Sequence, residues 1–157
     1  MKKILSAALA AIMLVLICVP AFAAETDAQP YTIIVSEQIL DLGRCTPYRE
    51  GDTVMVPLRK IGEALGYKVD WDAQTGAITI DDEYIQKATL YSGTAEVVFE
   101  GHLQIINMSR EVENSVKTVI HRGYTYVPLE FFREFLNDTA VEGSKIIIAP
   151  SMCEIME

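Results

Sequence analysis

Apolar residues along the chain follow two kinds of spacing, and each spacing predicts one type of element. Leu58, Ile61 and Leu65 are spaced at i, i+3 and i+7, which places them on one face of a helix. Short runs rich in β-branched and aromatic residues favour strands on either side of it. The expected strands are 31–35, 53–56, 77–80, 84–91, 95–100, 103–108, 116–120, 124–127 and 146–148.

The strand and helix pattern occurs twice, at an offset of 71 residues. Val-Pro-Leu at 56–58 is repeated at 127–129, and the apolar face of the second helix has the same spacing as the first. Gly66 and Asn137 follow the two helices, where a left-handed residue usually ends a helix. The last turn of the second copy is about three residues shorter. We therefore predict two related strand-helix-strand-strand halves, about 31–83 and 84–149.

Helices of two turns are not stable alone, so their apolar faces must pack against a sheet. We expect an α+β fold in which antiparallel β-sheets pack on two short helices. Each half alone would bury too little apolar surface. The prediction is therefore one domain over 24–157, with a short tail at its C-terminus.

The N-terminal segment 1–23 has the three parts of a secretory signal peptide. Lys2 and Lys3 precede an apolar run, and Ala21 and Ala23 are the small residues that a signal peptidase reads. We predict cleavage after Ala23 and an extracytoplasmic protein, secreted or held at the cell surface. An uncleaved anchor over 4–24, or lipid attachment at Cys18, would also place the rest of the chain outside.

Half of the 157 residues are apolar and mean hydropathy is +0.22, although the net charge is −9. Loss of 1–23 removes Lys2 and Lys3, so the net charge becomes −11. So acidic a chain argues against nucleic acid as a partner, and against a membrane partner beyond the signal segment. Its apolar content argues against disorder.

The exported part contains two cysteines, Cys45 and Cys153. In an oxidising compartment they would be able to form a disulfide, although spacing alone does not bring them together. The pairing and two unpaired thiols both remain open.

Two segments resemble the signature of the copper amine oxidase N-terminal-like domain, also called the stalk domain. They read GDTVMVPLRKIGEALGYKVDWD at 51–72 and GYTYVPLEFFREFL at 123–136. The second departs from the pattern at Glu130 and Asn137, and it lacks the Trp-Asp turn. The resemblance implies antiparallel sheet around a helix, in a surface protein typical of Gram-positive bacteria. It also implies a non-catalytic stalk, because copper and the tyrosine-derived quinone belong to a separate catalytic domain.

Catalytic and metal-binding motifs are absent from the sequence, so we expect no catalytic residue, cofactor or metal. His102 and His121 lie in predicted turns and favour surface positions. The segment 70–81 faintly resembles a calcium loop, but a hairpin explains the same residues. The acidic run 81–83 is expected to be solvated.

Phe131 and Phe135 widen the apolar face of the second predicted helix. They are either buried or part of an exposed patch that binds a partner, which Tyr124 and Tyr126 would extend. Both interpretations remain open.

We predict an exported non-catalytic module, interacting or structural, that binds a surface protein or a cell-wall polymer. The alternative is a small extracytoplasmic hydrolase that acts on the wall through acidic residues. The sequence does not indicate an oligomeric state.

Overall fold

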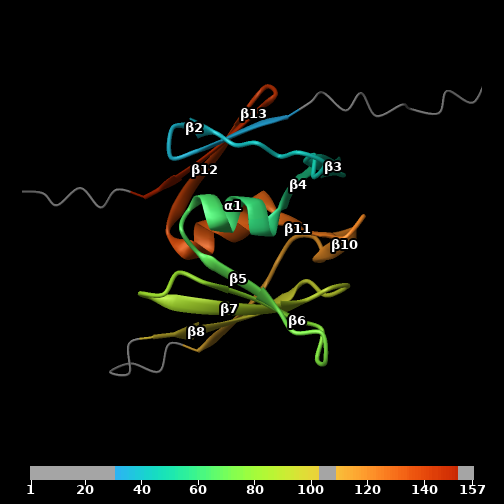
Figure 1. The fold of residues 1–157 in the computed structure, drawn as a ribbon, viewed down its shortest axis with the longest axis vertical. Coiled ribbons are helices and arrows are strands. Elements are labelled where there is room, and N and C mark those ends of the chain that lie inside the picture. The colour runs from blue at the N-terminus through green and yellow to red at the C-terminus, as the bar shows by residue number, and fades with distance from the viewer. Residues whose placement is uncertain (1–30, 103–108, 152–157) are drawn as a thin grey trace, which may run out of the picture.

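The computed structural model describes residues 31–102 and 109–151, which form thirteen strands and two short helices (Figure 1). In chain order the elements are β1 (Thr32–Val35), β2 (Gln38–Ile39), β3 (Tyr48–Glu50), β4 (Thr53–Pro57), α1 (Leu58–Ala64), β5 (Lys68–Trp71), β6 (Ala77–Asp81), β7 (Gln86–Tyr91), β8 (Glu96–Gly101), β9 (Arg110–Glu113), β10 (Val119–His121), β11 (Tyr124–Pro128), the 3₁₀ helix η1 (Leu129–Phe135), β12 (Asn137–Glu142) and β13 (Lys145–Pro150). The predicted strand at 103–108 lies outside the described residues. None of the described helices is long and apolar enough to cross a membrane.

The strands form three sheets. Their orders are β12-β13-β1-β2, β10-β11-β4-β3 and β5-β6-β7-β8-β9. Neighbouring strands are antiparallel except β1 and β13, which pair in parallel. The mostly antiparallel sheets and two short helices confirm the predicted α+β class.

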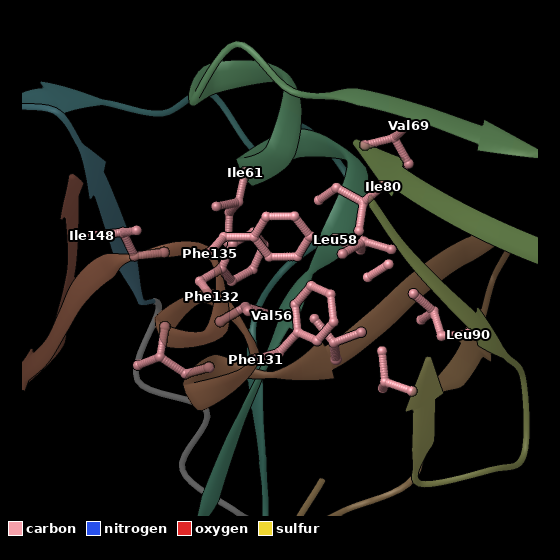
Figure 2. Packing of buried hydrophobic residues seen from close by; sticks show 14 of the residues in the cluster. Val56, Leu58, Ile61, Val69, Ile80, Leu90, Phe131, Phe132, Phe135 and Ile148 are labelled. Carbon is pink, nitrogen blue, oxygen red and sulfur yellow. The ribbon is translucent and has the colours of Figure 1, made fainter. Parts of the chain in front are cut away.

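Both helices lie between the sheet of β12 and β13 above and the five-stranded sheet below (Figure 1). One core cluster joins side chains from all three sheets with the apolar faces of α1 and η1. Figure 2 shows the aromatic rings of η1 pointing into this cluster beside Val56 and Leu58. The helices therefore hold the sheets together by apolar burial, as their spacing predicted.

The two Val-Pro-Leu segments lie side by side. Val56 pairs with Val127 where β4 and β11 run antiparallel, and each proline ends its strand before a helix. The hairpin after each helix enters a different sheet, and its connection has five residues at 72–76 but two at 143–144. The shorter second turn is thereby confirmed. The division near residue 83 falls between the paired strands β6 and β7, so the structure does not confirm two separate halves.

The helix ends differ from the prediction in the second copy. Gly66 has a φ of 85°, as predicted, but the left-handed residue after η1 is Leu136, with a φ of 55°. Asn137 instead buries its side chain, and its amide nitrogen donates to the carbonyl oxygens of Phe132 and Phe135 at 3.0 Å. The prediction for Asn137 was wrong because its side chain, rather than its backbone, satisfies the helix end.

Replacing Leu136 with asparagine is expected to raise the free energy of unfolding by about 0.5–1 kcal/mol. A left-handed backbone costs a branched residue about 1–2 kcal/mol, whereas asparagine tolerates it. Urea denaturation measures the change. Leu136→Ala removes the same exposed side chain but keeps the strain, so it should bring no such gain. Equal stability of Leu136→Asn and the parent would contradict strain at this position.

Candidate functional site

A groove of about 410 Å³ opens between α1, the β5–β6 hairpin and the β10–β11 hairpin. Most of its lining is apolar or aromatic, and a few charged side chains stand on α1. The lining residues are Pro57, Leu58, Arg59, Lys60, Glu63, Val69, Trp71, Ile78, Ile120, Gly123, Tyr124 and Thr125.

Trp71 is the largest apolar side chain of the groove. It pairs with Ile78 across β5 and β6, and alternation places it on the same sheet face as Val69. Val69 and Ile78 are buried, but Trp71, the last residue of β5, is 59% exposed. The apolar face of the five-stranded sheet therefore extends beyond the buried core, and the indole ring of Trp71 is the exposed part of it.

The β10–β11 hairpin contributes Ile120, Gly123, Tyr124 and Thr125 to the lining of the same groove. Arg122 and Gly123 form its two-residue turn, and both have positive φ, as a type I′ turn requires. Tyr124 is 36% exposed and Ile120 is also exposed. Ile120 pairs with Thr125, whereas Tyr124 lies on the strand face of the buried Tyr126. Ile120 is therefore the apolar side chain that this second sheet adds to the open surface of Trp71.

The three charged side chains of the groove, Arg59, Glu63 and Lys60, differ in whether they have a partner within the protein. The Nη1 atom of Arg59 donates to the carbonyl oxygen of Val69 at 2.7 Å and lies 3.6 Å from a carboxylate oxygen of Glu63. Lys60 is in none of the ion pairs found within residues 31–102 and 109–151. Two cations and one carboxylate line the groove, which leaves one net positive charge in a chain of net charge −9.

Three of the four residues of the possible aromatic partner surface are buried. Phe131, Phe135 and Tyr126 are at most 3% exposed. Phe131 and Phe135 pack against Phe99 of β8, with ring centroids 6.2 and 5.5 Å away, so burial was the correct alternative. Only Tyr124 stays exposed. The sequence reasoning missed Trp71, although its alternation with Val69 on a strand was a usable signal.

Cys45 is a fully buried thiol in a second, smaller apolar cluster with Met55 and Tyr126. Its Sγ donates to the carbonyl oxygen of Leu42 at 2.7 Å, and burial raises the pKa of the thiol. Cys153 lies outside the described residues, so the Cys45–Cys153 disulfide stays a prediction.

The two histidines are exposed, as predicted. His102 lies with its Nε2 2.7 Å from Asp81 Oδ1. With Asp82 these two residues form the one group of possible metal ligands found among the described residues, with ligand atoms within 4.8 Å of one another. His121 is not part of this group.

Asp82 is only 9% exposed, so the prediction of a solvated acidic run was wrong at this residue, whereas Glu83 is exposed. Its Oδ1 accepts hydrogen bonds from the backbone N–H groups of Tyr84, Ile85 and Gln86, at 2.7–3.0 Å. These contacts fix the turn between β6 and β7. We interpret the cluster as a structural feature that stabilises this turn, because the Oδ1 atoms of Asp81 and Asp82 already accept hydrogen bonds.

Burial acts to raise the pKa of Asp81, but hydrogen bonds from His102 and the Glu83 amide outweigh it, so the pKa lies below its usual 3.8. A carboxyl group whose pKa is lower in the folded chain than in the unfolded chain stabilises the fold at pH values above the unfolded pKa. This stabilisation is lost as the pH falls through the pKa of the folded chain.

We expect Asp81→Asn to lower the free energy of unfolding by about 0.5–1 kcal/mol at neutral pH and to have no effect at about pH 2. Urea denaturation at several pH values measures the change. Asp70→Asn, at an exposed pair with Lys68, is the control. A constant cost of Asp81→Asn down to pH 2 would contradict this.

The faint calcium-loop segment is a hairpin, as the alternative predicted. Asp72 Oδ1 accepts the backbone N–H of Gln74, and Oδ2 accepts the hydroxyl of Thr75, at 2.8 and 2.7 Å. The bond from Thr75 is the main cause that lowers the pKa of Asp72. These bonds orient the turn that follows Trp71.

A family model described as the copper amine oxidase N-terminal domain matches residues 35–145. The match includes every residue that lines the groove. No curated protein and no solved structure was found to match the chain.

Proposed function

The chain belongs to the copper amine oxidase N-terminal domain family, the non-catalytic part of those oxidases, and we propose that it is an exported binding module that attaches to cell-wall polymer. The signal-peptide pattern of 1–23 supports export. Binding to a surface protein is the other partner class that this family membership allows.

The uncovered aromatic groove is the observation that carries the proposal. A tryptophan that continues the core face of a sheet and stays 59% exposed leaves a large apolar surface in water. The groove volume of about 410 Å³ falls within the range of about 300–1,000 Å³ that ligand pockets occupy. An occupant that covers Trp71 and Ile120 would remove this surface from water.

The chemistry of the groove favours a wall polymer over a protein. Sugar rings present flat C–H faces that stack on an indole ring, and Trp71 offers such a ring in the groove. Wall polymers are also commonly anionic, which suits the net positive charge of the lining.

Nothing in the groove favours the hydrolase alternative. Glycoside hydrolysis uses two carboxyl groups about 5–9.5 Å apart. The groove lining contains one carboxylate, Glu63, and Arg59 neutralises it. Within the described residues, both carboxyl groups with a shifted pKa, Asp72 and Asp81, are shifted downward, which is the wrong direction for a general acid.

The test begins with expression of the full-length sequence in a Gram-positive host. We expect the protein outside the cell and, after purification, in the pellet with purified insoluble cell wall. Trp71→Ala should weaken this binding at least about tenfold, because buried aromatic contacts dominate binding energy. Tyr84→Ala removes an exposed aromatic side chain outside the groove and is the matched control. Retention inside the cell, or unchanged sedimentation of Trp71→Ala, would contradict the proposal.

A further inference from the structure

We infer that the groove selects sugar chains that carry carboxylate groups, with a ring stacked on Trp71 and a carboxylate held by Lys60. This inference rests on the proposed function and goes further by naming the class of ligand. Its first support is that Trp71 and Lys60 line the same groove from different elements, β5 and α1.

Lys60 is the cation that is available to a ligand. Arg59 precedes it in α1, but the guanidinium of Arg59 is held by the carbonyl oxygen of Val69 and by Glu63. Its charge is therefore largely compensated within the protein. Lys60 contributes the net positive charge of the lining, on a side chain that is only half-buried.

The surrounding charge sharpens this preference. A chain of net charge −9 repels polyanions over most of its surface, so a positive groove is a local exception. One ammonium group outside the ion pairs of the described residues fits one anionic substituent next to a ring. A densely charged polymer without rings would meet the repulsion and would have nothing to stack on Trp71.

Isothermal titration calorimetry of the exported protein with three soluble probes measures the contribution of the sugar ring and that of the negative charge separately. The first is a glycan strand of peptidoglycan from which an amidase has removed the peptides, so that alternate rings carry a lactyl carboxylate. The second is an N-acetylglucosamine oligomer of the same length, which has similar rings without charge. The third is poly(glycerol phosphate), which has charge without rings.

We expect the carboxylated strand to bind about fivefold tighter than the neutral oligomer, and poly(glycerol phosphate) not to bind measurably. Lys60→Gln should remove the fivefold preference and leave the neutral oligomer unaffected. Lys145→Gln removes an exposed lysine outside the groove and should keep the preference. Added salt of about 1 M should reduce the preference, since it screens charges beyond about 3 Å.

Trp71→Ala should weaken both sugar probes, and Trp71→Leu, which also removes the ring, serves the same purpose if Trp71→Ala does not fold. Equal binding of the two sugar probes, or the same loss from Lys60→Gln and Lys145→Gln, would overturn the inference while wall binding through the groove stands. Tighter binding of poly(glycerol phosphate) would also overturn it. If neither sugar probe binds and the wall pellet retains no protein, the proposed function fails as well.

Discussion

Replacing Phe131 with alanine is expected to lower the free energy of unfolding by about 3–5 kcal/mol. Its side chain is fully buried and packs on three other rings, those of Phe99, Phe132 and Phe135, with centroids 5.5–6.2 Å away. Truncation leaves a cavity where η1 meets the five-stranded sheet, and the surrounding rings are too constrained to fill it. Urea denaturation followed by circular dichroism measures the loss.

Tyr84→Ala is the matched control, because Tyr84 is 82% exposed and its removal should change stability by less than about 0.5 kcal/mol. If Phe131→Ala does not fold, Phe131→Leu should give a smaller but measurable loss. A cost of Phe131→Ala below about 1 kcal/mol would contradict the buried packing of η1.

Replacing Asn137 with alanine is expected to cost about 2–4 kcal/mol, although this side chain contributes no apolar packing. Its amide nitrogen lies 3.0 Å from the carbonyl oxygens of Phe132 and Phe135 and from the hydroxyl of Tyr67. Because Asn137 is buried, water cannot replace the lost donor, and each orphaned group costs about 1–3 kcal/mol. The same urea denaturation measures the loss.

Tyr67→Phe is the control, because it removes only one of these three contacts and should cost about 1 kcal/mol. Asn137→Asp keeps the size of the side chain but loses its donor, so it should destabilise at least as much as Asn137→Ala. Equal costs for Asn137→Ala and Tyr67→Phe would contradict a capping role for Asn137.

The fold could be predicted from the sequence where a local pattern fixes the backbone. The β-branched runs before Pro57 and Pro128 and the apolar spacing after them indicated both strand-helix units. Sequence could not show that β1 pairs in parallel with β13, because residues more than 100 positions apart meet there through the packing of both sheets. It also misplaced the left-handed residue, since the shift from Asn137 to Leu136 depends on a buried hydrogen bond.

The candidate site was harder to predict, because exposure depends on which element covers a side chain. Phe131 and Phe135 are aromatic, as residues of partner surfaces often are, but Phe99 of β8 packs against both of them. Trp71 alternates with the buried Val69 along β5, which is the spacing of a core residue. Nothing among the described residues covers it fully, however, since β5 ends there. Local spacing indicates which face a residue occupies, and only tertiary packing decides whether that face ends in the core or in a groove.

The most direct test of the groove uses the fluorescence of Trp71, the single tryptophan of the chain. Its indole is 59% exposed in the groove, so its emission reports on the occupancy of that surface. We expect soluble cell-wall fragments to shift the emission to shorter wavelength and to protect it from acrylamide quenching, as the ring leaves water. Unchanged emission and quenching under conditions where the protein sediments with the wall would contradict binding through the groove, because binding would then occur elsewhere.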